Sequence, residues 1–139
     1  MGNWILKTEP STYSIDDLLR DKTTVWDGVK NPVALKHLRT MQAGDEVLIY
    51  HTGDEKAVVG TARVTRAAYA DPKKGDPRLV VVELRAGARV PAPVTLSTIK
   101  ADPVFKDLAL VRMPRLSVVP ATGVQWKRLL QLARRPSED

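Results

Sequence analysis

The amino-acid sequence predicts an α+β fold, in which strands alternate with short helices to form a small mixed β-barrel or curled sheet. The chain has 139 residues, of which 43% are hydrophobic, and this length suits one domain with its own core. Strand-like apolar runs are interleaved with segments of helical spacing, and the central strands are expected to be antiparallel. No repeat or linker divides the chain, so we expect one domain over residues 1–135 and a frayed tail over residues 136–139.

The first strand is expected over Asn3–Thr8, because Pro10 cannot continue a hydrogen-bonded ladder. Ser14 is a typical helix N-cap, and the two aspartates that follow it would meet the unpaired N–H groups of the first turn. The apolar residues of this segment predict a helix that ends near Asp21.

A second helix is expected after the turn that contains Trp26, Asp27 and Gly28. Pro32 suits its first turn, and Gly44 suits a stop just beyond its end. Near-helical spacing joins its apolar residues, which are Val33, Leu35, Leu38 and Met41.

The middle of the chain is expected to hold three strands, at Glu46–His51, Ala57–Tyr69 and Leu79–Arg85. Arg63 and Arg66 are offset by three residues, which indicates a bulge or a frayed end in the second of these strands. A turn-rich loop over Asp71–Pro77 separates the second strand from the third, and Pro91 and Pro93 are expected to close the unit.

The last third begins with a short helix over Leu96–Lys100, capped by Thr95. A brief turn is expected at Asp102, followed by a last strand over Leu116–Val119. Thr122 would then cap the final helix, where Trp126 has helical spacing with several leucines and is expected to pack in the core.

The composition excludes several classes of protein. Without cysteine the chain has no disulfide framework, thiol nucleophile or thiolate metal site, and two histidines are too few for a histidine-rich zinc site. The sequence shows no signal peptide and no apolar run near the ~20 residues of a membrane helix. We therefore expect a soluble, cytoplasmic protein with no metal, no cofactor and no membrane partner.

Positive charge is concentrated in the second part of the chain, and the total is +6. Residues 1–60 contain 7 Lys and Arg against 9 Asp and Glu, whereas residues 61–139 contain 15 against 7. A basic patch would favour a polyanionic partner such as nucleic acid, because each cation placed near a phosphate releases condensed counterions. A scattered, solvated surface explains the same numbers equally well.

Four features could carry chemistry. Trp26 adjoins a turn where a base could stack on its ring, although it could equally close one end of the core. Lys7, Thr8 and Glu9 leave the first strand together, but an exposed ion pair is the simpler interpretation. His51 ends a strand and could contact a base or transfer a proton.

The fourth feature is the segment Leu110–Val118, where arginines and a proline could face phosphates or base edges, or form an ordinary basic loop. His37 lies beside two cations on the second helix and is expected to be solvated. The sequence contains no phosphate-binding glycine loop, nucleophile elbow or HExxH pattern, so it has no strong signature of an enzyme.

Four blocks, in order along nearly the whole chain, resemble the EVE domain family: Trp4–Ser14, Trp26–Asn31, Tyr50–Thr52 and Leu110–Val118. The resemblance implies a PUA-like fold, a small β-barrel flanked by short helices. It also implies kinship with domains that read methylated adenine in RNA or methylated cytosine in DNA. Pro32 departs from the family, which usually has an aromatic residue at that position.

The resemblance further implies a pocket for a modified base, with Trp26 as its aromatic wall. The residues carried over to this pocket are Lys7, Ser11, Trp26, Asp27, Gly28, Val29, Asn31, His51, Arg112, Met113, Arg115, Leu116 and Ser117. We therefore expect a non-catalytic reader of modified bases in DNA or RNA. The alternatives are a hydrolase of acylated nucleosides, like one in the related ASCH domains that uses Lys, Thr and Glu, and a protein-interaction module.

Overall fold

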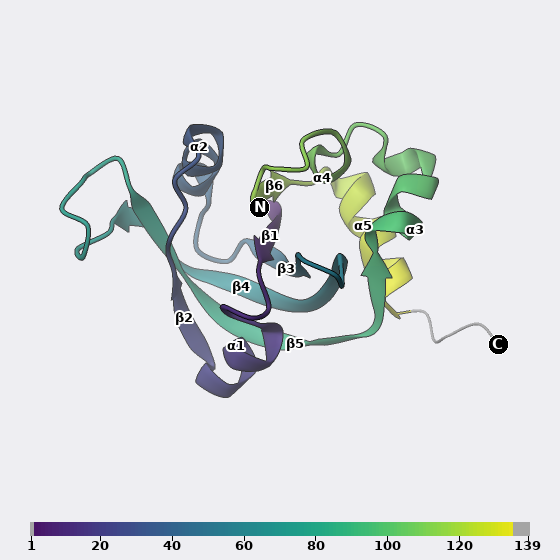
Figure 1. Ribbon diagram of the computed structural model, residues 1–139, viewed down its shortest axis with the longest axis horizontal. Helices are drawn as coiled ribbons and strands as arrows, with labels where there is room; N and C mark the ends of the chain where they lie inside the picture. Colours follow the sequence, from purple (N-terminus) through teal and green to yellow (C-terminus); the bar gives the residue numbers. More distant parts are fainter. Residues whose placement is uncertain (1, 135–139) are drawn as a thin grey trace.

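Six strands form one mixed sheet in the order β2-β5-β4-β3-β1-β6 (Figure 1). The computed structural model describes residues 2–134, so the predicted tail at 136–139 lies outside the described residues. The strands are β1 (Asn3–Thr8), β2 (Thr23–Trp26), β3 (Glu46–His51), β4 (Ala57–Ala70), β5 (Val80–Thr95) and β6 (Val118–Pro120). The helices are α1 (Ile15–Asp21), α2 (Pro32–Thr40), α3 (Leu96–Ala101), the 3-10 turn η1 (Pro103–Phe105), α4 (Ala109–Arg112) and α5 (Gly123–Arg134).

The sheet is open, so the prediction of a barrel was wrong. Within residues 2–134, β2 pairs with β5, β6 pairs with β1, and these two short strands are the edges of the sheet. The expectation of antiparallel strands was also incomplete, because β1 runs parallel to β3 with Asn3 opposite Glu46. Parallel pairing is possible here because α1, β2 and α2 supply the long crossover that it requires.

The β4–β5 hairpin is longer than predicted. Its register runs from Ala70 opposite Val80 to Ala57 opposite Thr95, and it shifts between Val64 and Arg66, as the predicted bulge requires. The prolines at positions 91 and 93 do not end β5. They lie between two paired positions at which β5 has extra residues, so the ladder loses no N–H donor there.

The helix caps predicted at Ser14, Thr95 and Thr122 are confirmed. Ser14 and Asp17 form a reciprocal capping box at the start of α1, and Thr95 caps α3. Thr122 accepts a hydrogen bond from the Gln125 N–H at the start of α5. The Asn31 side chain accepts from two N–H groups in the first turn of α2, which begins at Pro32. β2 and α4 were not predicted, since four residues give too short a pattern to recognise.

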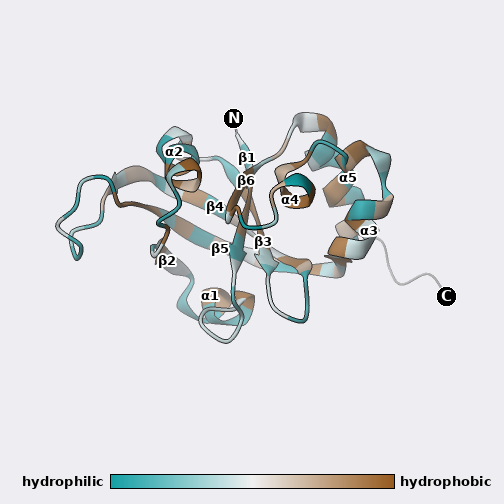
Figure 2. Cartoon of the chain, turned by 45° about the horizontal axis from the view of Figure 1, so that its top comes forward, coloured by the Kyte–Doolittle hydropathy of each residue, from teal (hydrophilic) through white to brown (hydrophobic). Residues whose placement is uncertain are grey.

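The core lies between the sheet and the helices that cover it, where the hydropathy colouring is most apolar (Figure 2). Trp126 is buried, as expected. His37 is not simply solvated, because its ring lies 5.8 Å from the Trp4 ring and burial lowers its pKa. In the part of the chain that the structure describes, no helix is long and apolar enough to cross a membrane.

Candidate functional site

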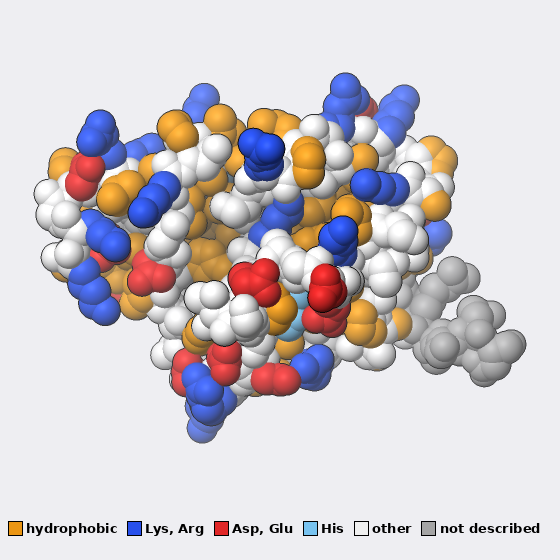
Figure 3. Space-filling view, viewed as in Figure 1, with side chains coloured by type: hydrophobic (Ala, Val, Ile, Leu, Met, Phe, Trp, Pro, Cys, Tyr) orange, Lys and Arg blue, Asp and Glu red, His pale blue; other side chains and the backbone are white. Residues whose placement is uncertain are grey.

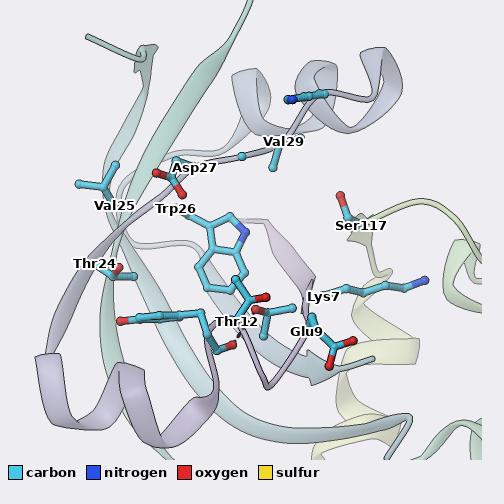
Figure 4. Close-up of a pocket in the computed structure, with 13 residues that line it drawn as sticks. Lys7, Glu9, Thr12, Thr24, Val25, Trp26, Asp27, Val29 and Ser117 are labelled. Carbon is cyan, nitrogen blue, oxygen red and sulfur yellow. Dashed lines mark hydrogen bonds between the residues drawn. The ribbon is translucent and has the colours of Figure 1, made fainter. Parts of the chain in front are cut away.

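A cavity of about 570 Å³ opens between β2 on one side and β1 with the start of β6 on the other (Figure 4). Its lining includes residues of one edge strand, β2, and the residue before the other edge strand, β6. Its walls come from the end of β1 and the loop after it, from β2 and the turn after it, and from the residue before β6. The lining residues are Lys7, Thr8, Glu9, Thr12, Tyr13, Thr24, Val25, Trp26, Asp27, Gly28, Val29, Lys30 and Ser117.

The Trp26 indole lies at the centre of the cavity lining (Figure 4). It is only 8% exposed, and its nitrogen edge faces the space beside Val29 and Ser117 (Figure 4). The Tyr13 ring meets it edge to face, with the ring centroids 6.3 Å apart. Burial raises the pKa of the Tyr13 hydroxyl, which donates a hydrogen bond to Asp21. The two rings are fixed nearly at right angles, and Trp26 also belongs to the hydrophobic core.

The turn after β2 places a charged and an apolar side chain around the cavity mouth. Gly28 has a φ of +79°, a backbone conformation that residues other than glycine rarely adopt. After this turn the buried Val29 packs inward, whereas Asp27 and Lys30 remain exposed at the rim. The turn therefore supplies a carboxylate acceptor and an ammonium donor beside an apolar surface.

Lys7 connects the end of β1 to the segment before β6. Its ammonium donates a hydrogen bond of 2.7 Å to the Pro114 carbonyl and lies 5.8 Å from the centre of the Tyr50 ring. Its backbone N–H donates to the Ser117 carbonyl at 3.0 Å. Burial lowers the pKa of Lys7, because partial removal from water disfavours the charged form. An anionic group at this wall would offset that cost.

Six of the residues predicted for the pocket line the cavity: Lys7, Trp26, Asp27, Gly28, Val29 and Ser117. Four others line a shallower hollow beside it, with Pro114: Asn31, Met113, Arg115 and Leu116. Ser11 and Arg112 line neither: the Ser11 hydroxyl donates to Glu9, and the Arg112 guanidinium donates to Asp107. Tyr13 was missed, although it belongs to the first of the four blocks.

His51 was also predicted at the pocket, and the structure places it elsewhere. It is 4% exposed, and its Nε2 accepts a 3.0 Å hydrogen bond from the Ile15 N–H at the start of α1. Its Nδ1 lies 2.7 Å from the Glu55 carboxylate. Because Nε2 is an acceptor, the ring proton is assigned to Nδ1, whose N–H donates a hydrogen bond to the Glu55 carboxylate. This arrangement ties α1 to the end of β3.

We expect His51→Ala to lower the free energy of unfolding by roughly 2 kcal/mol, because the buried Ile15 N–H loses its acceptor. Denaturant unfolding measures this loss. Glu55→Gln is the matched control, since its amide oxygen can still accept from Nδ1 and the Ile15 bond is untouched. A stability equal to that of the unmodified protein would contradict the assigned role of His51.

Lys7, Thr8 and Glu9 all line the cavity. Their polar groups are nevertheless engaged in different directions. The Thr8 hydroxyl donates to the Tyr13 carbonyl, and the Glu9 carboxylate accepts from the Thr52 hydroxyl at 3.3 Å. Within residues 2–134, no group of three His, Asp or Glu side chains could hold a metal ion.

Comparisons with known proteins agree on one family. A model of the EVE domain matches residues 2–132. Chicken thymocyte nuclear protein 1 is 27% identical, over 94% of this chain and 68% of its own length. A solved structure from Rhodopseudomonas palustris is 36% identical with a TM-score of 0.90, and covers 96% of this chain and 93% of its own.

Two further solved structures bear on the site and the fold. Human THYN1 in complex with DNA containing 5-methylcytosine is 25% identical with a TM-score of 0.89, covering 97% of this chain and 99% of its own. An ASCH structure from Zymomonas mobilis has a TM-score of 0.64 at 14% identity, over 94% of each chain, and so shares the general fold alone.

Proposed function

This chain belongs to the EVE domain family, and we propose that it binds nucleic acid carrying a modified base, which it holds in the cavity beside Trp26. The observation that carries this proposal is the Trp26 indole, fixed edge to face against Tyr13 at the wall of an open cavity. The human relative bound to DNA containing 5-methylcytosine supports the same class of ligand. We take 5-methylcytosine in DNA as the first ligand to test.

The energetics suit a base that has left its stack. Extruding a base costs a few kcal/mol, whereas stacking it on an aromatic side chain returns about 1–3 kcal/mol. A volume of about 570 Å³ lies within the range of small-molecule sites. The Asp27 and Glu9 carboxylates at the rim could accept hydrogen bonds from an exocyclic amine, the contact by which acidic side chains read cytosine.

The decisive experiment compares oligonucleotides that differ by one methyl group. Burying a methyl group contributes roughly 0.8 kcal/mol, so we expect a preference of about fourfold for 5-methylcytosine over cytosine at equal salt. Fluorescence anisotropy with matched DNA and RNA oligonucleotides measures this ratio. Equal affinity for modified and plain oligonucleotides of both kinds would refute the proposal.

One observation favours the alternative of a hydrolase acting on an acylated nucleoside. Lys7, Thr8 and Glu9 line one cavity, and these are the residue types that the related hydrolase uses. Their separate hydrogen bonds to Pro114, Tyr13 and Thr52 leave no pair of them joined as nucleophile and base. Release of acetate from acetylcytidine, lost in Lys7→Ala, would favour the hydrolase over the reader.

A further inference from the structure

A second groove, of about 360 Å³, lies on the other side of Lys30 from the cavity. It is formed by α2 and the end of the loop between β4 and β5. Lys30 lines both the groove and the cavity, so the two adjoin at this residue. The lining residues of the groove are Lys30, Pro32, Leu35, Arg39, Asp76, Arg78 and Leu79.

Two of the three positive charges of this groove, those of Arg39 and Arg78, are held by contacts. The Arg39 guanidinium donates a 2.7 Å hydrogen bond to the Arg78 carbonyl, which ties α2 to the base of the hairpin loop. Arg78 in turn forms an ion pair with Asp76 at 3.0 Å. Three cations against one carboxylate leave the groove with a net positive charge.

The loop beyond the groove adds two exposed cations, Lys73 and Lys74. None of the ion pairs found within residues 2–134 includes Lys30, Lys73 or Lys74. These three ammonium groups therefore keep their charge available to an outside anion. We call Lys30, Arg39, Lys73, Lys74 and Arg78 the basic band.

The opposite side of the cavity carries more acidic side chains (Figure 3). Below the apolar hollow in Figure 3, acidic side chains over α1 and the turn between β3 and β4 are mixed with Lys and Arg, whereas Lys and Arg predominate above the hollow and over the hairpin loop. The aspartates of α1 form ion pairs with Arg20 or Arg89. Glu9 extends from the cavity wall toward that turn and accepts a hydrogen bond from Thr52. The unpaired ammonium groups of the basic band attract a polyanion that approaches the cavity.

From these unpaired cations beside the cavity we infer that the basic band holds phosphates of the nucleic-acid backbone on one side of the base that enters the cavity. The inference rests on the proposed function for the place of the base and adds the path of the strand. The band joins cations of α2 and the hairpin loop, which are far apart in sequence and meet only in the folded chain. Phosphate contacts of this kind set affinity and register without distinguishing bases.

The test is the salt dependence of binding to a duplex DNA that contains one 5-methylcytosine. Log affinity falls linearly with log salt, and each lost phosphate contact reduces the magnitude of this slope by about 0.9 on duplex DNA. We therefore expect the double variant K73Q/K74Q to lower that slope by about 1.8, and to weaken plain and methylated DNA by the same factor. The matched control, K127Q/R134Q, removes two cations from α5 at the other end of the molecule (Figure 1) and leaves the slope unchanged.

The outcomes separate this inference from the proposed function. An unchanged slope in K73Q/K74Q, or an equal fall in both double variants, overturns the basic band. The ratio of affinities for methylated and plain DNA tests the cavity independently. If the protein binds methylated and plain DNA equally, but K73Q/K74Q reduces the salt slope, the proposed role of the basic band stands. The proposal that the protein reads a modified base is then refuted.

Discussion

Replacing Trp26 with alanine is expected to weaken binding of an oligonucleotide containing 5-methylcytosine by roughly 5- to 150-fold. That range corresponds to the loss of about 1–3 kcal/mol from stacking one base on an aromatic ring. The indole is the central wall of the cavity, and Tyr13 meets it edge to face rather than covering it. Fluorescence anisotropy or calorimetric titration at fixed salt gives the affinity.

Two controls separate stacking from stability. Trp26 is largely buried, so its removal also destabilises the fold, and thermal melting must show that the variant is folded at the temperature of the titration. Trp26→Phe keeps an aromatic face and should retain most of the affinity. Trp126→Phe changes an equally buried tryptophan on α5, outside the cavity, and should alter stability without altering affinity. Full affinity in a folded Trp26→Ala protein would contradict the stacking role.

The second large effect is expected at Asp45, which is 2% exposed. Its carboxylate accepts hydrogen bonds from the Trp4 indole at 2.9 Å and from the N–H groups of Gly2 and Gln42, both at 3.0 Å. Removing this charged acceptor leaves the buried Trp4 N–H unpaired, at a cost of about 1–3 kcal/mol, and takes the partner from two part-buried N–H groups. We expect Asp45→Ala to lower the free energy of unfolding by at least about 3 kcal/mol, as measured by denaturant unfolding.

The same residue makes a prediction about pH. Burial alone would raise the pKa of Asp45, but the hydrogen bonds from Gln42, Trp4 and Gly2 outweigh it, so the pKa lies below the ordinary 3.8. The stability contributed by this carboxylate is therefore fully present above pH 3.8 and is lost as pH falls through the lower folded-state value. The free energy of unfolding of Asp45→Ala, measured as a function of pH, should lack that part of the acid dependence. If the free energies of unfolding of Asp45→Ala and of the unmodified protein depend on pH in the same way, this prediction is wrong.

Much of the fold could be predicted from local signals. The caps at Ser14, Thr95 and Thr122 were correct because a cap depends on a few neighbouring residues. The parallel pairing of β1 with β3 could not be predicted from local signals, since the residues of a strand do not determine which other strand it pairs with. The length of β5 was underestimated because Pro91 and Pro93 end a strand only where the ladder needs their missing N–H groups.

The site shows the same division. The turn at Asp27, Gly28 and Val29 was recognised from its residue types, and its residues do line the cavity. His51, named beside them, caps α1 instead, because the register of β3 and the position of α1 bring its Nε2 to the Ile15 N–H. Whether a polar side chain meets a ligand or a backbone group depends on which segment packs against it, and that segment can be distant in sequence.

The sequence by itself determined the α+β class, the helix caps, most of the strands and the family of this protein. Only the tertiary structure decided that the sheet stays open, and that Trp26, Tyr13 and Lys7 lie around one cavity. Only the folded chain also sets the basic band beside that cavity. The physical reason is range: caps and periodicity act over a few residues, whereas edges, cavities and charged surfaces arise where distant segments meet.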